Sequence, residues 1–323
     1  TLPNYMTFKT SIHIATTKQL PIKIFLLVCF FLNAIFCFGK HPLSFTLSTP
    51  TQISTQQEAL DYLSHFNFKG TGKSWPNVKQ HLFISNIKKN ITHPINIYPG
   101  EGTYFCAYAA LSYLLLQDDP LGYTRFITSL YKDGKATYNE IVYEPSTTIK
   151  REAGLLKYKG IMDIQPADQM WFLTLANHFK GYLNIFNQKY DPGDEGSFWA
   201  SVNYGKFNRM CNKILDFDIT AKGSDFLRPR IKDLYGFIAE KLSKGKVVLY
   251  INNRIVHKKN HIKIKLAVPT HFIVVEKIYK VNDIITLIYW DNGGRTLIQL
   301  SPAFLKRIVY GITSFTKPGA DAL

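Results

Sequence analysis

The pattern of hydrophobic and polar residues changes at about two-thirds of the length of the chain. Before Gly245 the apolar residues recur mainly with helical spacing, and after it they form short runs rich in β-branched residues. We predict a helix directly after Thr55 and further helices at Cys106–Leu116, Gly122–Lys132, Gln169–Phe179 and Ile231–Leu242. Strands are predicted at Lys246–Asn252, His271–Ile278, Ile284–Trp290 and Thr296–Leu300. Consecutive helices followed by consecutive strands predict an α+β fold with an antiparallel sheet.

The segments between these elements are predicted to be connections. Residues 67–100 carry Gly, Pro, Asn and Lys and are expected to form a loop with short strands. Residues 133–160 are expected to be irregular, and residues 187–224, rich in Gly, Asn and Asp, to contain short helical pieces. We expect the helical insert at about 120–224 to form a substrate-facing subdomain.

Polar side chains mark the expected starts of several helices. Thr55 and Glu58 have the spacing of a capping box, in which each side chain binds the backbone of the other residue. The other predicted N-terminal residues are Asp168, either Ser224 or Asp225, and Ser301 before Pro302.

Residues 1–39 have the composition of an export signal. Three lysines and no acid lie between Met6 and Lys23, Ile24–Phe38 contains no charge, and the small residue Gly39 follows. The apolar run is shorter than the roughly 20 residues of a membrane-spanning helix, which favours a secretory signal peptide over an uncleaved signal anchor. We therefore expect a secreted or periplasmic protein with one domain at 40–323. Membrane attachment is expected only if this segment is retained.

The charge of the chain is strongly basic. The formal net charge is +16, and it falls to +13 without the three lysines of residues 1–39. A basic surface favours acidic partners, such as anionic envelope polymers or lipids. No zinc knuckle, basic amphipathic helix or aromatic RNA-binding motif accompanies the charge, so nucleic acid is not predicted as a partner. The basic segment Arg254–Lys265 either lines a cleft that prefers acidic substrates or forms a solvated hairpin.

Cysteine usage argues against a disulfide scaffold. Two of the four cysteines, Cys29 and Cys37, lie in the predicted signal segment, which leaves Cys106 and Cys211 for at most one bridge. The chain contains neither C-x-x-C nor H-E-x-x-H. We therefore expect neither a metal nor a cofactor.

Cys106 is the first candidate for a chemical role. It begins a predicted helix after the glycine-containing segment Pro99–Thr103. A helix N-terminus carries partial positive charge and unpaired N–H groups, which favour a thiolate over a thiol. The two glycines would let a substrate backbone approach closely. A buried cysteine on an apolar helix face is the alternative interpretation of this segment alone.

His271 and Asp291 are candidate partners, since each lies at the end of a predicted strand. They lie opposite each other if the hairpin loop is centred on Val281, and we expect this register with a loop over Tyr279–Asp283. A two-residue turn at Asn282–Asp283 would instead place Gly294 opposite His271 and is expected to separate the pair. Alternatively, the Asp291 side chain could form an Asx-turn that stabilises the tight turn beginning at Asn292.

Three segments carry a resemblance to a known family. GEGTYFCAYAALSYLL around Cys106, HFIVVEKI from His271 and YWDNGG around Asp291 resemble papain-like cysteine peptidases. They look closest to the bacterial double-glycine (bacteriocin-processing) branch, over residues 95–310. The resemblance implies a cysteine-bearing helix packed on an antiparallel sheet. It also implies that Cys106 is the nucleophile, His271 the base and Asp291 the residue that orients the histidine.

One position departs from the family pattern. The family usually has a glutamine about six residues before the cysteine, and its side chain donates to the oxyanion. Gly100 occupies that position here, with the carboxylate of Glu101 beside it. Thr103 is a weak substitute, and the backbone N–H of Cys106 is the expected donor.

Three functions agree with these features. The first is a thiol hydrolase that cleaves a peptide, protein or cell-envelope amide substrate. The second is an acyltransferase of transglutaminase type that uses the same residues with an amine in place of water. The third is a non-catalytic binding protein on a peptidase-like scaffold, which the absent glutamine favours.

Overall fold

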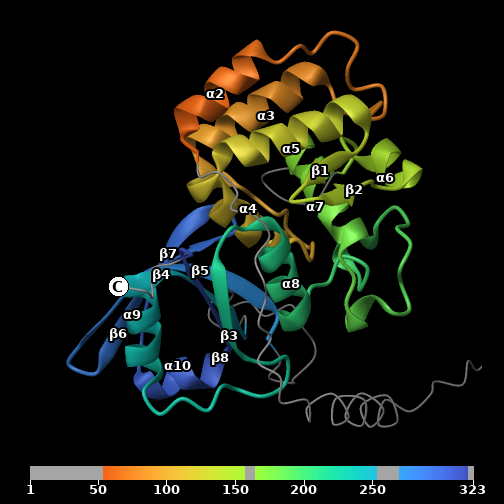
Figure 1. Ribbon diagram of the computed structural model, residues 1–323. Helices are drawn as coiled ribbons and strands as arrows, with labels where there is room; N and C mark the ends of the chain where they lie inside the picture. Colours follow the sequence, from red (N-terminus) through yellow and green to blue (C-terminus); the bar gives the residue numbers. More distant parts are fainter. Residues whose placement is uncertain (1–53, 157–163, 253–268, 319–323) are drawn as a thin grey trace, which may run out of the picture. The chain divides into compact units, whose positions relative to one another are not determined.

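The computed structural model describes residues 54–156, 164–252 and 269–318. They belong to one compact unit, Leu47–Leu323. Helices combine with an antiparallel sheet, so the predicted α+β class is confirmed (Figure 1). The predicted signal segment and the basic segment Arg254–Lys265 lie outside the described residues. No helix among the described residues is long and apolar enough to cross a membrane.

The main sheet has six strands in the order β3-β8-β4-β5-β6-β7, and all neighbouring strands are antiparallel. The strands are β3 (Asp218–Gly223), β4 (Gly245–Ile251), β5 (His271–Val281), β6 (Ile284–Asp291), β7 (Gly294–Leu300) and β8 (Val309–Thr316). The four predicted strands are confirmed as β4 to β7. β8 was not predicted, although it lies inside the sheet, because glycine, serine and threonine interrupt its apolar run.

The described residues also form nine α-helices, three short 3-10 turns and one small hairpin. The helices before the sheet are α2 (Gln56–His65), α3 (Gln80–Thr92), α4 (Cys106–Asp118), α5 (Pro120–Asp133), α6 (Thr147–Glu152), α7 (Pro166–His178) and α8 (Tyr204–Ile214). The short 3-10 turns are η1 (Pro94–Asn96), η2 (Tyr182–Asn184) and η3 (Asp194–Gly196). The remaining elements are α9 (Leu234–Lys244), α10 (Pro302–Ile308), β1 (Ala136–Tyr138) and β2 (Ile141–Tyr143).

The predicted helix starts at Cys106 and after Thr55 are confirmed, and the Thr55–Glu58 capping box is present. The predicted loop over residues 67–100 is wrong, because α3 lies inside it. Phe83, Ile87 and Ile91 recur every four residues and form the buried face of α3, but the surrounding polar residues obscured that spacing. Residues 133–160 are likewise not wholly irregular, since they contain β1, β2 and α6.

Two predicted helix caps are wrong, whereas a third is confirmed. α7 begins at Pro166, where proline is favoured, so Asp168 lies inside the first turn. Asp233 caps α9, and neither Ser224 nor Asp225 does. Ser301 caps α10 as predicted.

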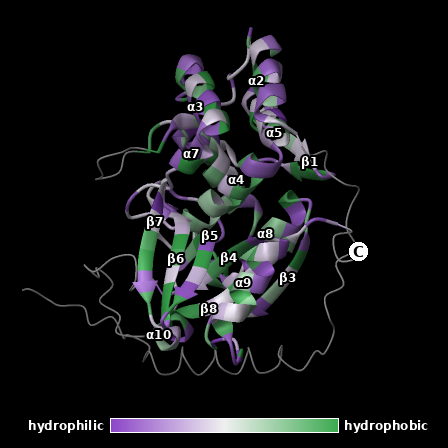
Figure 2. Cartoon of the chain, turned by 90° about the vertical axis from the view of Figure 1, so that its left-hand side faces the viewer, coloured by the Kyte–Doolittle hydropathy of each residue, from purple (hydrophilic) through white to green (hydrophobic). Residues whose placement is uncertain are grey.

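The two faces of the sheet bury separate hydrophobic clusters. Val248, Phe272 and Val274 face α4 and α8, and the alternating residues Leu249 and Ile273 face α9 and α10. Figure 2 shows green, hydrophobic stretches along the strands of this sheet. α4 also contacts α5 and α7, so it lies between the helical part and the sheet (Figure 1). Its first residue therefore lies where the two parts meet.

Candidate active site

Cys106 is the first residue of α4, as predicted. The preceding residue, Phe105, makes no side-chain hydrogen bond to the first turn. The N–H groups of that turn have no partner within the helix. The thiol is free and half-buried, and its Sγ lies 4.0 Å from the carbonyl oxygen of Thr270. Cys106 thus combines partial exposure with the positive end of a helix.

The loop before Cys106 has a fixed shape. Gly100 and Gly102 adopt the left-handed region, with φ of +88° and +79°. The Thr103 hydroxyl donates to the carbonyl of Pro99 at 2.8 Å and accepts from the Phe105 N–H at 3.2 Å. Thr103 is therefore committed to the loop and does not replace the family's glutamine.

Gly100 is also confined by its surroundings. A Cβ atom at this position would lie 2.7 Å from the side chain of Ile164, whereas a Cβ at Gly102 would meet no atom within 4 Å. A glutamine at residue 100 would therefore carry the strain of a left-handed backbone and would require the Ile164 side chain to shift.

His271 and Asp291 are brought together by the ends of β5 and β6. The Nε2 atom of His271 lies 2.6 Å from Oδ1 of Asp291, and both side chains are buried. Because Nε2 faces the carboxylate, Nδ1 is the ring nitrogen left to face the thiol. Burial lowers the pKa of His271, but hydrogen bonds and charges from Asp291 and Cys106 outweigh it and raise the pKa to about 10.

The predicted hairpin register is wrong, although the two residues meet. The turn consists of Asn282 and Asp283, both with positive φ, and Val281 pairs with Ile284. Between Lys277 and Val275 the register shifts by one residue, which leaves Glu276 as a β-bulge. Continued to the strand end, the shifted register places residue 293 opposite His271.

This shift explains why the histidine and the carboxylate share one face. Without the bulge, residue 294 would lie opposite His271, and Asp291, three residues away, would point to the other face. With the bulge, Asp291 is two residues from the opposite position, which is the diagonal position on the same face. The prediction that a two-residue turn separates the pair is therefore wrong, because it did not include the bulge.

Glu276, the bulged residue, joins three elements of the site. Its carboxylate accepts a hydrogen bond from the Tyr113 hydroxyl of α4 at 2.7 Å and pairs with Arg295 of β7. Tyr113 also stacks on Trp290, the neighbour of Asp291, with ring centroids 4.9 Å apart. The helix that carries Cys106 is thus fixed to the strand that carries Asp291.

Glu276 was not identified from the sequence, although a signal was present. In HFIVVEKI, the adjacent polar residues Glu276 and Lys277 interrupt the alternation that a regular strand requires.

A hydrogen bond fixes the end of β6. The indole N–H of Trp290 donates to the carbonyl of Ile95 at 2.9 Å. This bond joins the strand to η1, close in sequence to the loop before Cys106.

The described residues contain no group of three His, Cys, Asp or Glu side chains that could hold a metal ion. The three residues singled out from the sequence, Cys106, His271 and Asp291, lie together. Comparison of the chain with protein-family models, curated proteins and solved structures gave no match. The geometry of the site itself therefore carries the functional argument.

Proposed function

We propose that this chain is a secreted, papain-like thiol hydrolase that cleaves a peptide or another amide bond through Cys106, His271 and Asp291. The observation that supports this most is the buried His271–Asp291 contact of 2.6 Å beside a half-exposed thiol at a helix N-terminus. A nucleophile, a base and a residue that orients the base are the parts that acyl transfer needs.

The raised pKa of His271 sets the order of the proton transfers. At neutral pH the ring is an imidazolium, which stabilises the Cys106 thiolate as an ion pair. The thiolate attacks the carbonyl carbon of the substrate, and the backbone N–H of Cys106 donates to the oxyanion. His271 then gives its proton to the leaving amine, and the carbonyl carbon stays bound to sulfur as a thioester.

Water completes the reaction. His271, now neutral, accepts a proton from the water molecule that attacks the thioester, and the thiolate leaves. Asp291 keeps the ring oriented and stabilises the imidazolium through both stages. An amine in place of water would give the acyltransferase reaction with the same residues.

The proposal is tested with a 4-nitrophenyl acyl ester and the full chain. We expect a burst of nitrophenolate with an acyl adduct on the Cys106 peptide, detected by mass spectrometry. Cys106→Ala abolishes the burst, whereas Cys211→Ala, which alters the other described cysteine, leaves it. A wild-type chain that forms no adduct on Cys106 contradicts the proposal and supports the non-catalytic alternative.

Product analysis separates hydrolysis from acyl transfer. Unlabelled peptides are incubated with the chain, with and without an added primary amine. Free carboxylic acid as the main product in both cases supports the hydrolase. A product that carries the added amine supports the second function.

A further inference from the structure

Asp225 is a half-buried carboxylate close to the proposed site. Its Oδ1 accepts a hydrogen bond from the backbone N–H of Tyr204 at 2.8 Å, the hydroxyl of Tyr182 also binds the carboxylate, and the Tyr250 hydroxyl lies beside it. No ion pair of Asp225 occurs in the described part of the chain. The carboxylate therefore has hydrogen-bond donors there but no cation.

Tyr250 lies between Asp225 and the proposed nucleophile. Its hydroxyl donates to the carbonyl of Pro269 at 3.2 Å, and Cys106 Sγ lies 4.0 Å from the next carbonyl, that of Thr270. Burial, together with the charges of Asp225 and Cys106, raises the pKa of Tyr250. The Tyr250 hydroxyl thus lies beside the carboxylate and contacts the backbone segment that Cys106 Sγ also approaches.

Aromatic rings lie beside the carboxylate. Tyr182, whose hydroxyl binds Asp225, stacks on Phe226 with ring centroids 6.5 Å apart. The two residues are 37% and 50% exposed, so both rings are partly accessible from solvent. A carboxylate with exposed aromatic faces attracts an ammonium or guanidinium group by charge and by cation–π interaction.

We infer that Asp225, Tyr182 and Phe226 form a subsite that binds a cationic group of the substrate, such as a lysine or arginine side chain, beside Cys106. The inference rests on the proposed function, in which Cys106 is the nucleophile. Burial raises the pKa of Asp225 despite the hydrogen bonds that lower it, so the ionised carboxylate is incompletely stabilised by its present partners. A substrate cation supplies the missing charge.

Three methanethiosulfonate reagents of different charge test the subsite. A thiolate attacks the sulfenyl sulfur, a disulfide forms and methanesulfinate leaves, with the thiol proton passing to His271 or solvent. The cationic reagent carries a trimethylammonium-ethyl group, the anionic one a sulfonatoethyl group and the neutral one a methyl group. Mass spectrometry of the Cys106 peptide from the full chain gives each rate, which is divided by the rate of the same reagent with glutathione.

The variant that tests the inference is Asp225→Asn, which keeps an oxygen acceptor for the Tyr204 N–H. We expect the ratio of cationic to anionic rates to fall by about threefold or more, because the charge attracting the cation is removed. The neutral reagent should react at an unchanged rate. The basic net charge of +16 favours anions on average, so a loss of cation preference in this variant reports the local carboxylate.

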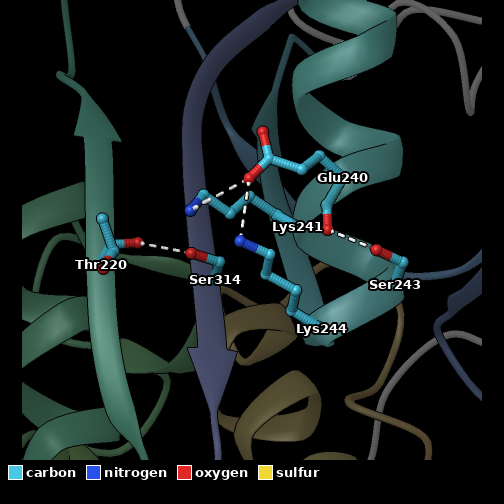
Figure 3. A network of polar contacts seen from close by, with 6 residues as sticks. All are labelled: Thr220, Glu240, Lys241, Ser243, Lys244 and Ser314. Carbon is cyan, nitrogen blue, oxygen red and sulfur yellow. Dashed lines mark hydrogen bonds and ion pairs between the residues drawn. The ribbon is translucent and has the colours of Figure 1, made fainter. Parts of the chain in front are cut away.

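Glu240→Gln is the matched control. Glu240 lies on α9, which packs on the other face of the sheet, and it pairs with Lys244 at 3.3 Å (Figure 3). The substitution removes the same charge, and the rate ratio at Cys106 should stay at the wild-type value.

The outcomes separate the subsite from the proposed function. An unchanged ratio in Asp225→Asn, or a thiol that no reagent reaches, overturns the subsite. A Cys106 that reacts with the neutral reagent no faster than glutathione contradicts the proposed function. The charge ratio still reports the subsite in that case.

Discussion

The Nε2 atom of His271 lies 2.6 Å from Oδ1 of Asp291, although the hairpin register places residue 293 opposite the histidine. The contact is diagonal across two neighbouring strands and depends on the β-bulge at Glu276. The alignment of the candidate base therefore depends on backbone geometry five residues away along β5. This relationship leads to tests at Asp291 and at Glu276.

Asp291→Asn should change how stability depends on pH. The folded pKa of His271, about 10, lies above the unfolded value of about 6.5, so its protonation stabilises the fold fully below pH 6.5. That contribution is lost as the pH rises through 10. Without the Asp291 charge the folded pKa falls, and the contribution is lost at lower pH.

Urea unfolding at pH 7, 8.5 and 10 measures this effect. The difference in unfolding free energy between wild type and Asp291→Asn should shrink as the pH rises, and other groups that titrate there cancel in that difference. A difference that is constant over this range shows that Asp291 does not raise the pKa of His271.

Glu276→Ala should lower the reactivity of Cys106. The substitution removes the acceptor of the Tyr113 hydroxyl and the side chain at the bulge, so the site loses its alignment. We expect the rate of Cys106 alkylation by iodoacetamide to fall about tenfold, the scale of small displacements in an active site. Glu276→Gln, which retains the acceptor, should restore part of the rate.

Arg295→Ala is the comparison for this variant. Arg295 is exposed, and its loss leaves the bond between Tyr113 and Glu276 in place. The alkylation rate should change little, because exposed ion pairs contribute weakly. Equal losses in Arg295→Ala and Glu276→Ala would assign the effect to the ion pair instead of the bulge.

Gly100 and Gly102 should respond differently to alanine. Both have positive φ, but only a Cβ at Gly100 approaches another side chain, that of Ile164, at 2.7 Å. We expect Gly102→Ala to cost about 1 kcal/mol from backbone strain and Gly100→Ala to cost about 1 kcal/mol more, from strain plus crowding. Denaturant unfolding compares the two, and equal costs contradict the described packing at residue 100.

Asp168 should make the fold more stable as the pH falls below 7. Burial raises its pKa to about 6, despite hydrogen bonds from Asn90 and Asn86. The folded pKa exceeds the unfolded value of about 3.9, so its contribution is complete below pH 3.9 and is lost as the pH rises through 6.

Comparison with Asp168→Asn isolates this contribution. Relative to the variant, the wild-type chain should gain about 2 kcal/mol of unfolding free energy between pH 7 and pH 4. The difference is measured by urea unfolding at each pH. A difference that falls toward pH 4 would mean that the buried carboxylate is better stabilised when ionised.

The sequence was sufficient for local elements with a strong pattern. Alanine and leucine predicted α4 from Cys106, and β-branched runs predicted β4 to β7. It was insufficient where partners distant in the chain decide the structure. The sequence of β3 is polar and exposed and does not itself predict a strand. It forms a strand because its backbone pairs with β8. The apolar spacing of α3 was readable but was obscured by its polar neighbours.

The candidate site divides in the same way. Cys106 and His271 could be identified because residue type and element end are local properties. The position of Asp291 required a register, and the bulge at Glu276 that sets it lies against Tyr113 of another element, a contact that the local sequence does not show. Asp225 was considered only as a helix cap, because its place beside Tyr250 arises from tertiary packing.

The most direct test of the central claim, that His271 activates Cys106, is the rate of Cys106 alkylation by iodoacetamide between pH 5 and pH 9. The rate is followed on the Cys106 peptide by mass spectrometry, with glutathione as the reference thiol. At pH 6 we predict that the wild-type chain reacts at least about tenfold faster than glutathione, whose thiol is almost wholly protonated there, and that His271→Gln removes this excess. A wild-type rate that follows glutathione across the range, unchanged in His271→Gln, would contradict the account.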